Sequence, residues 1–299
     1  MEQTQEKVRK SEKWFNKNYK ILMLLPIILT VLSLIYLFNF YSANNDLILK
    51  DTSLSGGTIL TLYGNLDFSN LESALKQEYT DISFRRLTNS QTGDITAFII
   101  ESSSQPEEIK ASVEKILGAE LKSEDYSLEF TGSNLSNSFY NQLIKAFLIA
   151  FILMSVVVFI LFRSFIPSIA VIFAAFSDIV MAIAAVDLLG IKMSAAGIAA
   201  FLMLVGYSVD KDILLTTRAL KKKEGALNQR IFGAFKVGIF MTLTALIAII
   251  PAFILIKDLP DSFRQIFLVL GIGLVADIFN TWLTNVGIIK WYCERKGRK

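Results

Sequence analysis

Three charged residues interrupt Leu204–Lys223, a stretch that otherwise has the apolar composition of a membrane span. They are Asp210, Lys211 and Asp212. A charge at the centre of a span costs about 2.5–3.5 kcal/mol on insertion scales, so such charges are rare and usually have a function. A carboxylate held there can bind and release a proton or a cation. We therefore expect Asp210 to be the one residue of this stretch that acts inside the membrane, and Asp178, in the preceding span, to be the strongest candidate for an ion carrier.

The spacing of the charges along a helix suggests which of them act together. Arg218 lies two turns beyond Asp210, about 12 Å along the helix axis, where the bilayer should end. Lys236, near the start of the next apolar run, should lie at a depth similar to that of Asp210. We predict Asp210 and Lys236 as partners. Lys211 and Asp212 point to other faces, and we favour the interpretation that they snorkel at the membrane boundary over a functional one.

Two further carboxylates are expected inside the membrane. Asp178 has alanines on its helix face, which let another helix approach closely, and Asp277 belongs to a polar stripe with helical spacing. Both fit an ion path, and the alternative for both is hydrogen bonding between packed helices. The complete set of ion-coupling candidates is Asp178, Asp210, Arg218, Lys236 and Asp277. The residues expected at polar helix interfaces are Gly206, Thr242, Thr244, Asn280, Thr281 and Thr284.

Several classes of chemistry are excluded by residues that the sequence lacks. There is no histidine, which excludes a Ser-His-Asp triad, a His-ligated zinc and a histidine proton relay. The one cysteine, Cys293, excludes an intramolecular disulfide. The phosphate-loop pattern GxxxxGK[ST] is absent, which excludes ATP hydrolysis by that route. We predict no catalytic residue, no metal and no cofactor, and therefore a protein that is not an enzyme.

The composition is that of an integral membrane protein with one polar domain. Hydrophobic residues make up 53% of the chain, an excess that must face lipid. Residues 41–138 differ, because they hold seven Lys or Arg against fifteen Asp or Glu. Their order of strand-like and helix-like segments is βαββαβ, with strands at 57–63, 81–87, 96–102 and 125–131 and helices at 69–79 and 106–117. This order predicts a ferredoxin-like α+β sandwich.

Six apolar runs predict six transmembrane helices, with the polar domain between the first and the second. The predicted organisation is an N-terminal segment at 1–20, a first span at 21–40, the polar domain at 41–138, a five-helix membrane domain at 139–289 and a tail at 290–299. Within the membrane domain the expected spans are about 142–162, 166–188, 193–215, 232–256 and 265–288.

Basic residues fall on one side of this arrangement. The N-terminal segment, the loop at 216–231 and the tail each hold several Lys or Arg, and the short turn at 163–165 holds Arg163. Such residues mark the cytoplasmic side of a membrane. We therefore predict a multi-pass protein of the plasma membrane, with both termini cytoplasmic and residues 41–138 extracytoplasmic. The lysines at 221–223 are explained by topology and by attraction to lipid headgroups, so no nucleic acid is needed to account for them.

This pattern resembles the SecD/SecF family of protein-export membrane proteins, which belongs to the resistance-nodulation-division superfamily. Gly56, Gly57 and Thr58 match the [ST]-G-G-T that opens the family's outer domain. Ser177–Asp178 matches the H-D pair of the third span, with Ser in place of His, and Gly206–Val209 matches G-Y-S-[IV] of the fourth. The resemblance covers nearly the whole chain.

The sequence also departs from the bacterial members of that family. In the bacterial members an Asn and an Asp follow G-Y-S-I, at the positions that Asp210 and Lys211 occupy in this chain. Those members also have a basic residue in the fifth span, and Lys236 lies one position away from its place. The segments DKDILLTTR and LVADIFNTW resemble the archaeal branch.

The resemblance implies an accessory subunit of the Sec machinery that works with SecD. It would use the transmembrane ion gradient to help secreted polypeptides leave the channel, and its outer domain would contact the unfolded chain. The implied partners are SecD, the Sec translocation channel, the translocating polypeptide and membrane lipid. The alternatives are a structural subunit that stabilises SecD and the channel without carrying ions, and a small-molecule exporter of the same superfamily.

Overall fold

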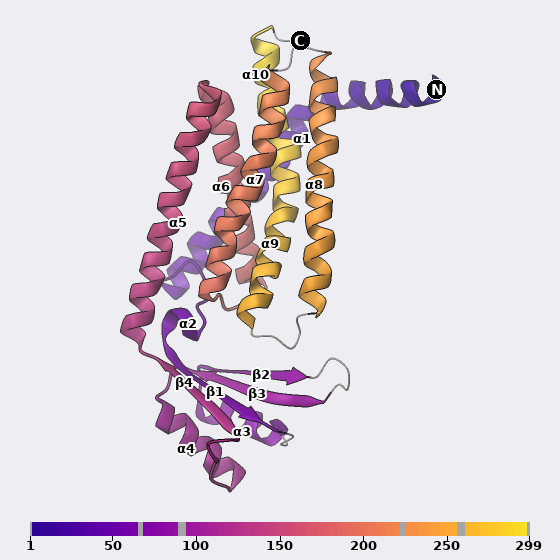
Figure 1. Ribbon diagram of the computed structural model, residues 1–299. Helices are drawn as coiled ribbons and strands as arrows, with labels where there is room; N and C mark the ends of the chain where they lie inside the picture. Colours follow the sequence, from indigo (N-terminus) through magenta and orange to yellow (C-terminus); the bar gives the residue numbers. More distant parts are fainter. Residues whose placement is uncertain (1, 65–67, 89–93, 222–224, 256–260, 298–299) are drawn as a thin grey trace.

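The computed structural model describes residues 2–64, 68–88, 94–221, 225–255 and 261–297 of the 299-residue chain. Long helices form a bundle that stands on a small sheet domain, and the first turns of the N-terminal helix leave the bundle sideways (Figure 1). Residues 89–93, between the predicted strands at 81–87 and 96–102, and residues 222–224 of the predicted basic loop at 216–231 lie outside the described residues.

The long helices agree in position with the six apolar runs. Their bounds are α1 (Glu2–Asn44), α5 (Ser133–Phe162), α6 (Phe165–Leu188), α7 (Ala195–Lys221), α8 (Leu227–Leu255) and α9 (Asp261–Phe279). The last of them continues through a π-helical segment, η2 (Asn280–Asn285), into α10 (Val286–Arg295). Most of these helices extend several residues beyond the predicted spans, because the bilayer limits only the length of the apolar run and not that of the helix.

Within the described residues, five helices are long and apolar enough to cross a membrane. The five lie in α1, α5, α6, α8 and the rod formed by α9, η2 and α10. Helix α7, expected as a further span at 193–215, is not among them, because Asp210, Lys211 and Asp212 lower its apolar character. It nevertheless packs inside the bundle against α6, α8 and α9 (Figure 1).

The centre of the bundle is formed by α6, α7 and α9, and small residues let these helices approach closely. Ala175 and Ala182 are fully buried on α6. A Cβ atom at Gly273 of α9 would overlap Leu204 of α7, and one at Gly238 of α8 would overlap the ring of Trp282. Close backbone approach of this kind allows short polar side chains on different helices to reach one another.

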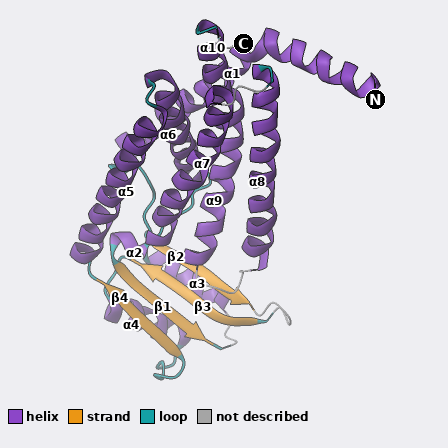
Figure 2. Ribbon diagram, turned by 45° about the horizontal axis from the view of Figure 1, so that its top comes forward, coloured by secondary structure: helices purple, strands orange, loops and turns teal. Residues whose placement is uncertain are grey.

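The sheet domain has the predicted βαββαβ order of elements (Figure 2). Its four strands form an antiparallel sheet in the order β2-β3-β1-β4. A one-turn helix, α2 (Thr52–Ser55), precedes the first strand and was not predicted. The other elements are β1 (Gly57–Tyr63), α3 (Phe68–Glu78), β2 (Ile82–Thr88), β3 (Ile95–Ser102), α4 (Pro106–Leu117) and β4 (Tyr126–Thr131).

The two faces of this sheet differ. Alternate residues of the central strands point to one face, where Leu60 of β1 and Phe98 of β3 pack against α3 and α4. The ring of Phe98 stacks on that of Phe68 at 4.4 Å between centroids. The opposite face turns toward the bundle, and a cavity of about 750 Å³ lies between it and the ends of α8 and α9. This face of the sheet is therefore separated from the ends of α8 and α9 by the cavity.

The chain between α1 and β1 ties the two parts together. Asp51 N–H donates to the carbonyl of Met193 at 3.0 Å, and Met193 N–H donates to that of Leu49 at 2.6 Å. The side chain of Gln265, at the start of α9, accepts from Ser194 N–H at 2.7 Å and donates to the carbonyl of Lys192 at 2.8 Å. The ends of α7 and α9 are therefore linked to the sheet domain by hydrogen bonds.

Asp51 should make stability depend on pH. It caps α2, and its Oδ1 accepts from the backbone N–H and the hydroxyl of Ser53. Burial raises the pKa of Asp51 to about 6, and the negative charge of Glu101 adds to the rise. The folded state therefore binds this proton more tightly than the unfolded state, whose Asp pKa is about 3.9. The contribution of Asp51 to the free energy of unfolding should fall as the pH rises from about 4 to about 6.

We expect Asp51→Asn to remove this slope and to stabilise the protein near pH 7 by on the order of 1 kcal/mol, since Asn can also cap a helix. The measurement is denaturant unfolding of the purified protein at pH 4, 5, 6 and 7, with Asp81→Asn at a solvent-exposed carboxylate as the control. A variant whose stability follows pH with the same slope as the wild type would contradict the prediction.

Candidate functional site

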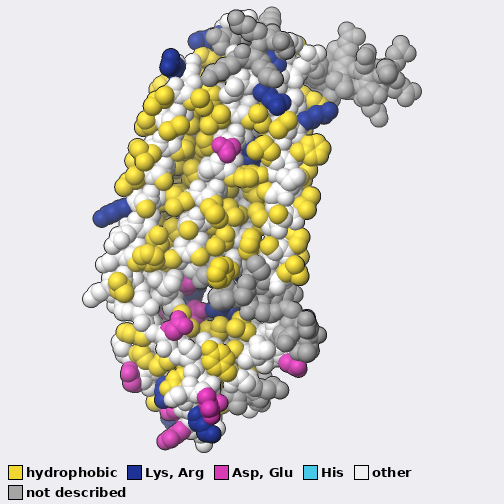
Figure 3. Space-filling view, in the orientation of Figure 1, with side chains coloured by type: hydrophobic (Ala, Val, Ile, Leu, Met, Phe, Trp, Pro, Cys, Tyr) yellow, Lys and Arg dark blue, Asp and Glu magenta, His cyan; other side chains and the backbone are white. Residues whose placement is uncertain are grey.

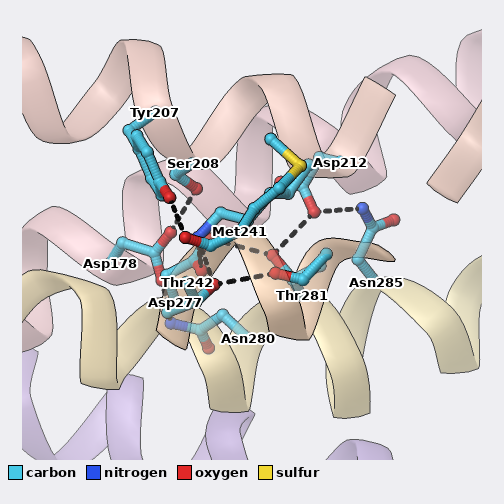
Figure 4. Close-up of polar contacts among 12 residues, drawn as sticks. Asp178, Tyr207, Ser208, Asp212, Met241, Thr242, Asp277, Asn280, Thr281 and Asn285 are labelled. Carbon is cyan, nitrogen blue, oxygen red and sulfur yellow. Dashed lines mark hydrogen bonds and ion pairs between the residues drawn. The ribbon is translucent and has the colours of Figure 1, made fainter. Parts of the chain in front are cut away.

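A set of buried polar side chains lies in the middle of the bundle and joins five helical segments, as Figure 4 illustrates. We call it the central polar network. Its members are Asp178 of α6, Ser208, Lys211 and Asp212 of α7, Thr242 of α8, Asp277 of α9, and Asn280, Thr281 and Asn285 of η2. All nine are buried, and buried polar groups in hydrocarbon persist only where they have partners.

Asp178 is held from two sides. One carboxylate oxygen accepts a hydrogen bond from the hydroxyl of Ser208 at 2.5 Å, and the other accepts from the amide of Asn280 at 2.7 Å. The side chain is completely buried. Its neighbour Ala174 is also completely buried, so the small side chains on this face admit η2 and α7 as expected.

Lys211 and Asp277 form an ion pair between α7 and α9 inside the bundle. The ammonium of Lys211 also donates to the hydroxyl of Thr242 at 3.2 Å and lies 4.6 Å from the ring centre of Tyr207. Neither charged side chain has any exposed surface. The interpretation of Lys211 as a residue that snorkels at the membrane boundary was therefore wrong. Its stem points into the bundle, where a carboxylate and an aromatic face replace water around the charge.

Asp212 was also assigned to the boundary, and this too was wrong. It is completely buried, and its Oδ1 accepts from the hydroxyl of Thr281 at 2.9 Å and from the amide of Asn285 at 2.6 Å. Its Oδ2 is buried and has no hydrogen-bond partner among the described residues. Thr281 also lies 3.1 Å from Asp277, so this hydroxyl connects the two carboxylates.

Asp210 and Lys236 are not brought together. Both are exposed on the surface of the bundle, and no ion pair joins them among the residues that the structure describes. Successive residues of an α-helix are rotated by about 100° around its axis, so Asp210 lies on a different face from its buried neighbour Lys211. The basic residue of the network is thus Lys211 of α7 and not Lys236 of α8.

The remaining predicted residues lie outside the network. Arg218 donates to the carbonyl of Gly233 at 2.7 Å and joins α7 to α8 on the side of the network away from the sheet domain (Figure 1). Thr244 is exposed and bonds to the carbonyl of Phe240 in its own helix. Thr284 lies 3.4 Å from the carbonyl of Met23 in α1. Gly206 is exposed on the same face of α7 as Asp210.

The glycine motif of the sheet domain has a structural role. Gly56 and Gly57 have φ angles of +84° and +139°, which L residues with side chains rarely adopt. The hydroxyl of Thr58 donates to the carbonyl of Ser104 at 2.6 Å. These residues turn the chain from α2 into β1, far from the central polar network.

The π-helical segment η2 carries the last residues of the polar stripe. In an α-helix Asn285 would lie about 140° around the axis from Asn280. The i→i+5 bonding of η2 brings Asn285 above Asn280 and next to Thr281, so that all three face the carboxylates. Single π-helical turns inside α-helices occur frequently at functional sites. α-Helical spacing also places Asn285 one turn beyond Thr281, about 40° around the axis, so the polar stripe could have been extended to it.

The charges of the network do not balance. Three carboxylates, those of Asp178, Asp212 and Asp277, face one ammonium, that of Lys211, and all four are buried. If every group were ionised, two negative charges would remain in excess. An uncompensated charge inside a protein costs several kcal/mol, so the network requires bound protons or a cation to offset the excess. This arrangement is chemically suited to bind and release positive charge.

Comparison with known proteins identifies what the chain is similar to. Residues 111–295 match the family model described as protein export membrane protein SecD/SecF, C-terminal. A protein-export membrane protein SecF of Methanothermobacter thermautotrophicus is 37% identical over 284 residues, which are 93% of this chain and 94% of the relative. One from Methanocaldococcus jannaschii is 36% identical over 283 residues, which are 92% and 96% of the two chains.

Solved structures show the same fold. The crystal structure of SecDF, a translocon-associated membrane protein from Thermus thermophilus, matches 93% of this chain with a TM-score of 0.71 and 18% identity. A second SecDF structure, in a super-membrane-facing form, matches 95% of this chain with a TM-score of 0.61 and 19% identity. The chain spans only 38% and 39% of those SecDF chains.

Proposed function

The chain belongs to the SecD/SecF family of protein-export membrane proteins, and from this premise we propose that it is a SecF-type accessory subunit of the Sec protein-export machinery. It is a multi-pass membrane protein that acts in a complex with SecD. Identity above 35% to archaeal SecF proteins over more than nine-tenths of the chain supports this assignment.

The second part of the proposal is that the subunit couples export to the transmembrane ion gradient through the central polar network. The observation that carries it is the excess of two buried carboxylates over the ammonium of Lys211. Protonation or cation binding changes the charge of this network, and a change of charge at the contact of packed helices can favour one packing over another. About 2.3 kcal/mol is available per elementary charge for every 100 mV across the membrane.

The third part of the proposal concerns how the helices and the sheet domain are placed relative to the membrane. Helix α7 crosses the bilayer as a sixth span. Its charged residues Lys211 and Asp212 point into the bundle and so are not presented to lipid. Both termini lie in the cytoplasm, as the basic segments require. The sheet domain is then extracytoplasmic, and its element order and its strand order 2-3-1-4 support a ferredoxin-like sandwich. In this position it can contact a polypeptide that leaves the channel.

A structural subunit that carries no ions is the second candidate. The observation in its favour is that both oxygens of Asp178 already accept hydrogen bonds from protein groups, as a residue that only holds helices together would do. The two candidates differ in whether export depends on the ion gradient through this chain.

The test uses vesicles that contain the Sec channel and SecD, with and without this chain. We expect the chain to raise the yield of exported polypeptide while the gradient is present, and this gain to vanish when an ionophore collapses the gradient at constant ATP. A gain that survives the ionophore would reject ion coupling and leave the structural subunit. No gain in either condition would reject the accessory role itself.

A further inference from the structure

Three buried side-chain oxygens in and beside the central polar network have no hydrogen-bond partner among the residues that the structure describes. They are Oδ2 of Asp212, Oγ1 of Thr216 and Oδ1 of Asn285. All three residues are completely buried. Buried polar atoms nearly always have a partner, so each exception requires an explanation. Oxygens with unused lone pairs are suited to contact a positively charged ligand.

The three residues come from neighbouring parts of α7 and η2. The amide of Asn285 donates to Oδ1 of Asp212 at 2.6 Å, so these two side chains are in direct contact (Figure 4). Thr216 follows Asp212 by four residues and therefore projects from the same face of α7, one turn further on. At 1.5 Å per residue, Asp212 lies roughly 25 Å and 14 Å from the two ends of α7. The oxygens are therefore deep inside the bundle.

Thr216 differs from Thr242 of the neighbouring helix. A threonine inside a helix can donate its hydroxyl to the carbonyl of the preceding turn of its own helix. Thr242 does so, to the carbonyl of Gly238 at 3.1 Å. The hydroxyl of Thr216 makes no such bond within the described part of the chain, although it is completely buried. Its lone pairs are therefore available to a ligand beside Asp212.

The surroundings of the three oxygens are apolar. Leu215, Val286 and Ile289 lie one to four residues from Thr216 or Asn285 and are buried in a single hydrophobic cluster. The outer surface of the bundle is also mainly hydrophobic on the face that Figure 3 shows, as a surface in contact with lipid must be. Bulk water therefore does not solvate these atoms, and any compensating charge must be bound inside the bundle.

The charge of Asp212 differs from those of the two other carboxylates in what surrounds it. Asp277 is paired with the ammonium of Lys211. Asp178 accepts a hydrogen bond on each of its two oxygens. In Asp212, Oδ1 already accepts two hydrogen bonds, whereas Oδ2 accepts none from the described residues. One positive charge bound at Oδ2 would reduce the excess negative charge of the network from two to one.

We propose that Oδ2 of Asp212, Oγ1 of Thr216 and Oδ1 of Asn285 bind a monovalent metal cation, sodium. Carboxylate, hydroxyl and amide oxygens are the ligands that hard cations prefer, and one carboxylate matches one positive charge. A proton on Oδ2 would be shared with one further oxygen at most, whereas a cation contacts several oxygens at once. The assignment rests on the proposed ion coupling, for which it names the ion and the atoms that hold it. Sodium is here the transported ion.

Thermal unfolding of the purified chain in detergent tests the site, in sodium chloride and in choline chloride of equal concentration. Sodium should raise the Tm by about 2–4 °C, because an ion that binds only the folded state stabilises it. Asp212→Asn should abolish this rise, while its amide oxygen can still accept from Thr281. An equal Tm of the wild type in both salts would overturn the proposal. A Tm that follows pH but not sodium would overturn it in favour of a proton.

Thr216→Val separates a ligand from a residue that only packs, since valine has nearly the shape of threonine but lacks its oxygen. In choline the variant should be at least as stable as the wild type, because a buried hydroxyl without a partner is removed. In sodium it should lose most of the rise in Tm. Thr217→Val, at the next position of α7, is the matched control and should keep the rise. A full rise in Thr216→Val would overturn the proposal.

Binding of radioactive sodium to the purified chain measures the same site without unfolding. We expect one ion per chain in the wild type and none in Asp212→Asn. Absence of bound sodium in the wild type would reject this site and leave coupling to protons through Asp178 in place. A gain in export that survives the ionophore would reject ion coupling itself, whether or not sodium binds. The two failures are therefore distinguishable.

Discussion

Replacing Lys211 by alanine should destabilise the protein by about 3–5 kcal/mol. The substitution removes the only ammonium of the central polar network and leaves Asp277 as a buried carboxylate without its counter-ion. Loss of one partner of a buried ion pair has costs of this size, because the remaining charge keeps its desolvation penalty and loses its attraction. The measurement is the free energy of unfolding of the purified chain in detergent, from denaturant titration. We also expect less chain to accumulate in the membrane.

Two further variants show whether charge or side-chain volume causes this loss. The double variant Lys211→Met with Asp277→Asn removes both charges. The asparagine amide oxygen at position 277 can still accept a hydrogen bond from Thr281, so most of the stability lost in Lys211→Ala should return. Lys236→Met changes an exposed lysine on the neighbouring helix and should cost less than about 1 kcal/mol. A double variant as unstable as Lys211→Ala would show that packing, and not the ion pair, holds the site together.

Asp178→Asn should abolish the gain in export that depends on the ion gradient, while the protein remains folded and bound to SecD. Asparagine is nearly the same size as aspartate, and its oxygen can accept one of the two hydrogen bonds that Asp178 accepts. The hydroxyl of Ser208 can accept from the new amide in return. The side chain can no longer gain or lose a proton, so the charge of the network no longer responds to the gradient.

The measurement is export into vesicles with and without the gradient, for complexes of equal SecD content. Asp187→Asn is the matched control, because it makes the same change in the same buried helix, α6, outside the network. We expect the control to keep its dependence on the gradient. Normal gradient-dependent export with Asp178→Asn would remove this residue from the coupling mechanism and favour the structural subunit.

The pattern of apolar and charged residues along the chain was sufficient to predict most of the architecture. Apolar runs of span length identify membrane helices, because the bilayer thickness sets the number of residues that each needs. The alternating apolar residues of the sheet domain predicted its βαββαβ order, since a strand and a helix bury residues with different periods. Asp178 could be predicted to face protein from its place in the middle of a span and the small residues around it, and it is fully buried.

The partners of each charge were decided only by the tertiary structure. Within Leu204–Lys223, periodicity separates the faces of the helix, but it does not say which face points into the bundle. Asp210 was assigned inward and Lys211 and Asp212 outward, and the packing of α7 against α6 and α9 reverses this. The error has a physical cause, since burying Lys211 becomes favourable only where Asp277 meets it from another helix.

The π-helical segment η2 was not predicted either, because local spacing predicts an ordinary α-helix. It packs against α1 and α6 and contributes Asn285 to the site. The sequence by itself therefore determined that this is a membrane protein with one polar sheet domain and costly charges in its spans. Which charges meet was settled by the packing of helices far apart in the chain, because only that packing offsets the cost of burying them.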